Sequence, residues 1–272
     1  MLDFGLNQVT MSEAPLGDFL DVAAQLGCVG VELRNDLARP VFDESPAREV
    51  RERVQQRGLR LLGLSEVYPI NRWSDQIADE LCALITLASE AGAETINLIP
   101  CNDGTGTDAQ ARRDDLDRAI EGCLPLLKDA KIVALIEPLG FQSSSLRLKS
   151  ELIGAIARAN AGASIRIVHD TFHHALAGET EFYAKQTGIV HISGVSAADL
   201  QIGQMEDERR VLVDGQDRLD NLGQIQALRD AGYTGVFSFE CFAPEVRNQA
   251  QPTDAIQRSI DFISTRTQQI AA

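Results

Sequence analysis

The sequence has few histidines and no closely paired cysteines. Four histidines occur among 272 residues, and the five cysteines are scattered, with none in a C-x-x-C pair. An odd number of unpaired thiols argues against a disulfide framework and is typical of a reducing compartment, where cysteines serve as small core residues. We therefore expect a cytoplasmic protein.

Long apolar runs and positive charges are also scarce. No stretch reaches the ~20 apolar residues of a membrane span, and the N-terminus, MLDFGLNQVT, lacks the basic segment and apolar run of a signal peptide. The net charge is 25 − 40 = −15, which disfavours a nucleic-acid partner because phosphate binding needs a Lys/Arg footprint. We expect neither a membrane nor a nucleic-acid partner, whereas a homo-oligomer is compatible with the sequence.

The chain does contain a regular series of short apolar runs. They are rich in Val, Ile and Leu and nearly continuous in apolarity, as parallel strands buried on both faces are. The expected strands are Phe4–Leu6, Val29–Leu33, Leu59–Ser65, Thr95–Ile99, Ile132–Glu137, Ile165–Asp170, Ile189–Ser193 and Val236–Glu240.

Helical patterns lie between these runs, and a glycine often follows a helix just before the next strand. The expected helices are Leu16–Leu26, a helix from Ser45 or Pro46 to Gln56, Ser74–Ala91, Asp108–Lys128, Ser150–Asn160, Glu181–Thr187, Leu222–Ala231 and Thr253–Gln268. Eight βα units without a linker predict one (β/α)8 TIM barrel domain over residues 1–272. A doubly wound sheet is the alternative, but the first turn, NQVTMSE, lacks a Gly-rich phosphate loop.

Ligand-type side chains recur at the last four expected strands. Glu137 ends the fifth strand (IEPLGF), Asp170 ends the sixth (HDTFHH), His191 lies in the seventh (VHISG) and Glu240 ends the eighth (FSFECF). The carboxyl-terminal strand ends form the active site of such barrels, so these side chains are expected to meet. Their mixed oxygen and nitrogen donors suit Mn²⁺, Mg²⁺, Co²⁺ or Zn²⁺, with positions left open for a substrate.

Each of these residues also has an ordinary structural explanation. An acid at a strand end is commonly a solvated rim group or a helix cap, as Asp170 would be before Thr171. A single histidine in an apolar strand, such as His191, is commonly a hydrogen-bonded core residue. However, Glu137 and Glu240 lie in buried-looking strands, where an unpaired charge is costly. A shared cation would compensate both carboxylates.

These strand ends resemble the xylose isomerase-like barrel family of sugar and sugar-phosphate isomerases and epimerases, over essentially the whole chain. Within this family the chain resembles the inosose isomerase branch, which acts on 2-keto-myo-inositol. The segments that carry this second resemblance are VELRND (31–36), NDGT (102–105), IEPLGF with SSLR (136–147), DTFHH (170–174) and HISGV (191–195).

The resemblance implies a role for each candidate site residue. The implied roles are metal ligation by Glu137, Asp170, His191 and Glu240, proton transfer by Glu137 and Glu240, and substrate binding by His173 and Arg210. The last of these begins the stretch RVLVDGQ, which matches a family segment with an arginine before a Gly-containing turn. The chain departs from many relatives at Gly194, where they have an acid, so the partner of His191 is left unassigned.

The expected function is that of a divalent-metal-dependent isomerase of a polyol ketone, 2-keto-myo-inositol above all. The ion would polarise the carbonyl and stabilise an enediolate while carboxylates transfer the proton. The loops after the seventh and eighth strands show no phosphate nest, which favours an unphosphorylated ketone. A ketose 3-epimerase, a hydroxypyruvate isomerase and a non-catalytic sugar-binding protein are alternatives. An abasic-site endonuclease is disfavoured because four histidines are too few and the charge is −15.

Three further features have two interpretations each. Glu32 and Arg34 end the second strand and form either a salt bridge at the rim or a wall of the substrate site. The polar stretch 196–221 is either a lid or a solvated excursion. His174 is structural or exposed, because the helical step of about 100° per residue turns it away from the side shared by Asp170 and His173.

Overall fold

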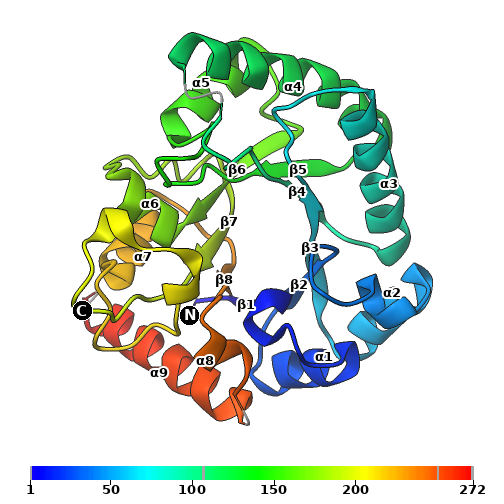
Figure 1. The fold of residues 1–272 in the computed structure, drawn as a ribbon. Coiled ribbons are helices and arrows are strands. Elements are labelled where there is room, and N and C mark those ends of the chain that lie inside the picture. The colour runs from blue at the N-terminus through cyan, green and yellow to red at the C-terminus, as the bar shows by residue number, and fades with distance from the viewer. Residues whose placement is uncertain (1, 106–107, 250, 271–272) are drawn as a thin grey trace.

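The computed structural model describes residues 2–105, 108–249 and 251–270. In this part of the chain, parallel strands close into a barrel in the order β1 to β8 (Figure 1). The strands are β1 (Phe4–Asn7), β2 (Gly30–Arg34), β3 (Arg60–Val67), β4 (Thr95–Leu98), β5 (Val133–Ile136), β6 (Ile165–Asp170), β7 (Thr187–Ile192) and β8 (Phe237–Phe239). The pairing of β1 with both β2 and β8 closes the barrel, and this confirms the predicted (β/α)8 fold.

Helices surround the barrel and cover its outer face (Figure 1). The α-helices are α1 (Leu16–Gln25), α2 (Ala47–Gln56), α3 (Asp75–Ala91), α4 (Ala109–Ala130), α5 (Lys149–Arg158), α6 (Thr171–Ala177), α7 (Asn221–Asp230), α8 (Pro244–Arg247) and α9 (Pro252–Ile270). Short 3-10 helices add η1 (Gln8–Met11), η2 (Val41–Glu44), η3 (Ile202–Gln204) and η4 (Asp207–Arg209). None of the helices in the described residues combines the length and apolarity needed to cross a membrane.

Local sequence signals set the bounds of most helices. The Ser74 hydroxyl accepts a hydrogen bond from the backbone of Ile77 at the start of α3, and Gly92 ends that helix in the left-handed conformation, with φ of 75°. Asp108 caps α4 through the backbone N–H groups of residues 110 and 111. Side-chain caps and left-handed glycines satisfy backbone groups that a helix end leaves unpaired.

The expected helix over Glu181–Thr187 is wrong. The helix after β6 is α6, which begins immediately after the strand because the Asp170 carboxylate accepts a hydrogen bond from the backbone N–H of His173. Gly178 ends it in the left-handed conformation, with φ of 68°. Residues 179–186 then form loop and turn. The cap provided by Asp170 therefore starts the helix about ten residues before the position that the glycine spacing predicts.

Gly140, in the loop after β5, allows that loop to lie directly against α6. A Cβ at this position would overlap the carbonyl oxygen of His173 and would lie 2.7 Å from the Cβ of Leu176. Contacts this short do not occur between unstrained atoms, so only glycine fits without displacing the helix. The position of α6, which carries His173, therefore depends on the absence of a side chain at residue 140.

Gly140→Ala should lower the free energy of unfolding by ~1–3 kcal/mol, the usual cost of overpacking. Thermal or denaturant unfolding measures this directly. Gly203→Ala is the matched control, because a Cβ at residue 203 meets nothing within 4 Å. Equal stabilities for the two variants would show that the loop and α6 do not constrain each other.

Candidate metal centre and pocket

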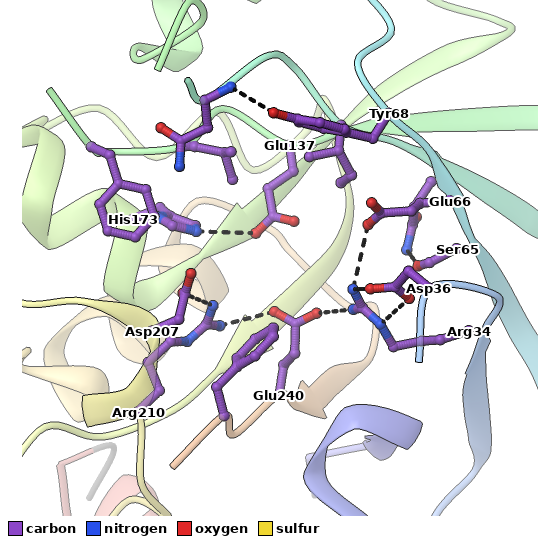
Figure 2. Close-up of a pocket in the computed structure, with 16 residues that line it drawn as sticks. Arg34, Asp36, Ser65, Glu66, Tyr68, Glu137, His173, Asp207, Arg210 and Glu240 are labelled. Atoms are coloured by element: carbon purple, nitrogen blue, oxygen red, sulfur yellow. Dashed lines mark hydrogen bonds and ion pairs between the residues drawn. The ribbon is translucent and has the colours of Figure 1, made fainter. Parts of the chain in front are cut away.

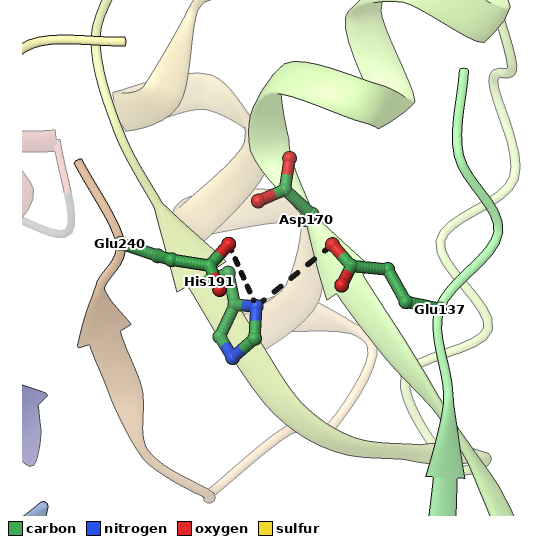
Figure 3. Close-up of side chains that lie close together, drawn as sticks. All are labelled: Glu137, Asp170, His191 and Glu240. Carbon is green, nitrogen blue, oxygen red and sulfur yellow. Dashed lines mark ion pairs between the residues drawn. The ribbon is translucent and has the colours of Figure 1, made fainter. Parts of the chain in front are cut away.

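The four predicted ligand residues meet at the carboxyl-terminal mouth of the barrel (Figure 3). Glu137 directly follows β5, Asp170 ends β6, His191 lies in β7 and Glu240 directly follows β8. All four are buried, and one potential ligand atom from each lies within 4.8 Å of the others. The Nδ1 atom of His191 is 3.3 Å from Oε2 of Glu240 and 3.9 Å from Oε1 of Glu137.

Unpaired buried atoms show that this cluster fits a metal ion. Nδ1 of His191 and Oε1 of Glu137 are both buried and have no hydrogen-bond partner in the described part of the chain. Buried polar atoms are nearly always paired, so such a pair of orphan atoms needs an explanation. Carboxylates with one imidazole form a common donor set for divalent ions. The cluster can therefore hold a metal ion.

The other nitrogen of His191 faces Glu32, which comes from β2 on a different part of the barrel. Nε2 of His191 lies 3.0 and 3.2 Å from the two carboxylate oxygens of Glu32, and both residues are buried. Because an ionised carboxylate only accepts, Nε2 carries the hydrogen and Nδ1 faces the cluster. Glu32 thus provides the carboxylate partner of His191 that a glycine at residue 194 cannot provide. It does not lie at the rim, and it does not pair with Arg34.

The charges around His191 favour a positive charge at this position. Burial alone would lower the pKa of the imidazole, but the carboxylates of Glu240 and Glu32 outweigh burial and raise the pKa well above its usual value. The Glu240 carboxylate that attracts this positive charge would also attract a cation in the cluster.

Two arginines hold Glu240 from opposite sides (Figure 2). Nη1 of Arg34 is 3.0 Å from Oε1 of Glu240, and Nη2 of Arg210 is 2.9 Å from Oε2. Burial opposes ionisation, but His191, Arg210 and Arg34 lower the pKa of Glu240 well below its usual range. Glu137 lacks an arginine partner in the described residues, and burial together with the charge of Glu240 raises its pKa to about 7.

Asp170 serves two partners with its two oxygens. Oδ1 accepts the backbone N–H of His173 at 2.8 Å and caps α6, whereas Oδ2 faces Nη2 of Arg210. Asp170 is therefore both a helix cap and a member of the cluster, the two alternatives that the sequence offered. The Nη1 and Nε atoms of Arg210 contact Asp207 at 3.1 Å and the Ser193 hydroxyl at 3.0 Å, so its guanidinium is held in place.

A pocket of about 340 Å³ opens beside the cluster. Glu137, Glu240, Arg210 and His173 line it, together with Arg34, Asp36, Glu66 and Tyr68 from the ends of β2 and β3 (Figure 2). Nε2 of His173 is 3.9 Å from Oε1 of Glu137, and burial lowers the pKa of this imidazole to about 3. His173 is therefore a neutral hydrogen-bonding group in the pocket wall.

The stretch 196–221 is attached to the barrel next to Arg210. Gly194 and Val211 form an antiparallel bridge, with backbone N–H···O distances of 2.7 and 2.8 Å. Met205 is buried and belongs to the same apolar cluster as Phe172 of α6. Through Met205 and Arg210 the stretch packs against the barrel and places Asp207 and Arg210 in the pocket wall, whereas residues 196–204 are exposed or half-buried.

His174 lies on the other side of α6 from the pocket and is buried. Its ring contacts the ammonium of Lys149 and packs against the rings of His169 and Phe182. Burial and the nearby Lys149 charge lower the pKa of His174 to about 3. Its role is to pack α6 against its surroundings.

The fold and the site define a (β/α)8 barrel with a buried carboxylate and imidazole cluster of the metal-binding type at its carboxyl-terminal mouth. The sequence pattern of the xylose isomerase-like TIM barrel family matches residues 20–266, and the chain belongs to this family, which includes sugar isomerases and epimerases.

Comparison with individual proteins gives one curated relative and several solved structures. An inosose isomerase of Bacillus velezensis is 34% identical over 100 residues, a match that spans 35% of this chain and only 33% of that protein. A xylose isomerase domain-containing protein of Salmonella typhimurium LT2 is 27% identical, with a TM-score of 0.87 and 97% of both chains covered. The IolI protein, whose structure contains a zinc atom, is 19% identical, with a TM-score of 0.81 and coverage of 97% and 99%, and this likeness shows the fold.

Glu32→Ala should weaken metal binding by ~10–100-fold, the usual effect of removing a partner that orients a ligand histidine. Glu32→Gln should retain more affinity, because its amide oxygen still accepts the Nε2–H of His191. Metal content after dialysis against a defined free-metal concentration measures both. Glu90→Gln, an exposed site on α3, is the control. Unchanged metal content in Glu32→Ala would show that His191 needs no such partner.

Three variants separate the roles of the residues at the end of β6 and in α6. Asp170→Asn should keep the cap of α6 but lose metal, because its amide oxygen still accepts a hydrogen bond while the charge is gone. His173→Ala should keep metal and lower kcat/KM by ~10–100-fold. His174→Ala should leave kcat unchanged and lower stability by ~1–3 kcal/mol, since Lys149 loses a buried partner.

Metal analysis, kinetics and unfolding are measured together for all three variants. Loss of the ion in His173→Ala, or loss of turnover in His174→Ala at full stability, would reverse these assignments.

Proposed function

We propose that this protein is a divalent-metal-dependent isomerase of a neutral polyol ketone, with 2-keto-myo-inositol as the leading substrate, acting in the cytoplasm. The observation that carries the proposal is the cluster of Glu137, Asp170, His191 and Glu240, which borders a pocket through Glu137 and Glu240. The stretch of similarity to an inosose isomerase supports the choice of substrate.

The charges of the pocket favour a neutral occupant. Five carboxyl groups line it, from Asp36, Glu66, Glu137, Asp207 and Glu240, against two guanidinium groups, from Arg34 and Arg210. One divalent ion would offset two of these negative charges. Glu66 and Glu137, whose pKa values are raised to about 7, carry only part of their negative charge near neutral pH, so the metal-loaded pocket is close to neutral and offers no net positive charge to hold a phosphate or carboxylate. This balance favours a polyol ketone over a sugar phosphate or hydroxypyruvate.

The proposed reaction moves a proton between neighbouring carbons of the substrate. A divalent ion held by Glu137, Asp170, His191 and Glu240 would polarise the carbonyl and stabilise negative charge on the enediolate. Glu137 and Glu240 approach from different strands (Figure 3), so one carboxylate can remove the proton while the other, as a carboxylic acid, returns it one carbon away. His173 and Arg210 hold and orient the substrate oxygens.

Removing the ion with a chelator should lower kcat/KM by at least ~100-fold, as expected for loss of electrostatic stabilisation at the reacting oxygens. Mn²⁺ or Co²⁺ should restore activity. The substrate panel contains inososes, free ketoses, ketose phosphates and hydroxypyruvate, and the inososes should react fastest.

Full activity of the metal-free protein would refute the metal-dependent mechanism. Faster epimerisation of a free ketose would move the assignment to a ketose 3-epimerase. Metal-loaded protein that binds a polyol without converting any of these compounds would indicate a sugar-binding protein.

A further inference from the structure

A second polar group of the pocket lies across the mouth from His191. Arg34, Asp36 and Glu66 form this group, which we call the β2–β3 wall, and all three line the pocket. In the strand order of the closed barrel, β3 is four strands from β7 in either direction and is therefore diametrically opposite. A substrate whose reacting carbons lie at the cluster extends its remaining carbons toward this wall.

Arg34 is fully committed to protein partners. Its Nε and Nη2 atoms form a two-point ion pair with Asp36 at 2.8 and 2.7 Å, and Nη1 contacts Glu240 at 3.0 Å. Gln8 accepts the backbone N–H of Arg34 at 3.0 Å. The guanidinium is thus a fixed part of the wall, because a planar fork held by two carboxylates has little freedom to turn.

Glu66 is held in place but keeps an unused acceptor. The side chain of Asn35 accepts the backbone N–H of Glu66 at 2.6 Å and donates to its carbonyl oxygen at 3.1 Å. Oε2 of Glu66 is 3.4 Å from Nη2 of Arg34, which already makes its shorter contact with Asp36. The hydrogen bonds of the described residues provide no partner for Oε1 of Glu66, and the side chain is only 17% exposed.

We propose that Glu66 is a specificity-determining residue whose free carboxyl oxygen binds a substrate hydroxyl on a carbon away from the reacting pair. This inference rests on the proposed function, because it takes the occupant to be a neutral polyol. A carboxyl group next to a fixed arginine and a second carboxylate recognises a hydroxyl and rejects an anionic group at the same place. Burial raises the pKa of Glu66 to about 7, with Arg34 offsetting part of this effect, so the group can accept or donate to a hydroxyl near neutral pH.

Equilibrium binding to the metal-loaded protein tests this inference without turnover. The probes are myo-inositol, which has no ketone, and its monodeoxy analogues, each lacking one hydroxyl. Wild-type protein should bind at least one deoxy analogue ~10–100-fold more weakly than myo-inositol, as loss of a hydrogen bond to a charged group implies. Glu66→Ala should bind myo-inositol and that analogue equally, whereas Glu66→Gln should keep most of the discrimination. Metal content should be unchanged, and Glu90→Ala on the exposed face of α3 is the control.

The outcomes separate this inference from the proposed function. Equal discrimination by Glu66→Ala and wild type, or weaker binding of all probes by the same factor, would overturn the role of Glu66 while leaving turnover of inososes intact. Wild-type protein that binds none of the polyols would also overturn it, and the metal-dependent turnover assay then decides the proposed function independently.

Discussion

The burial of carboxylates at the mouth of the barrel is the constraint around which the site is arranged. The buried acids are Glu32, Glu137, Asp170 and Glu240. An unpaired buried charge costs several kcal/mol, so positive groups are placed between these acids. His191 lies between the carboxylates of Glu32 and Glu240, and Arg34 and Arg210 hold Glu240 from its two sides. The same requirement explains why the cluster accommodates a cation: among the described residues the carboxyl group of Glu137 has no arginine partner and lies 3.9 Å from the His191 ring nitrogen.

Positive groups surround Glu240 more completely than Glu137, so the two carboxyl groups differ in pKa. His191 and two guanidinium groups lower the pKa of Glu240, whereas burial and the charge of Glu240 raise the pKa of Glu137, which has no guanidinium partner, to about 7. On the far side of the pocket Arg34 links Glu240 to the β2–β3 wall. The charges that stabilise the cluster and those that face the rest of a substrate therefore belong to one network.

The backbone around the site is arranged by the same side chains. Asp170 starts α6 with one oxygen and faces Arg210 with the other, so the helix that presents His173 begins at a member of the cluster. Gly140 lets the loop after β5 lie against this helix, and the Gly194–Val211 bridge directs Arg210 back into the mouth. Segments that are far apart in the sequence therefore pack against one another around the site. A substitution in any of them is expected to shift the side chains that contact the substrate, because protein interiors are closely packed.

The sequence by itself determined the barrel, because alternating apolar runs and helical patterns report local burial and local hydrogen bonding. It also determined the four ligand-type residues, because each follows or lies in a recognisable strand. The helix expected at Glu181–Thr187 failed because the spacing of glycines carried less weight than the cap at Asp170. Only the tertiary structure decided that Glu32 is the partner of His191 and that Arg34 holds Glu240, since β2 meets β7 and β8 only across the interior of a closed barrel. Contacts between strands that are not neighbours produce no periodic pattern in a sequence, because these strands approach each other only when the barrel closes.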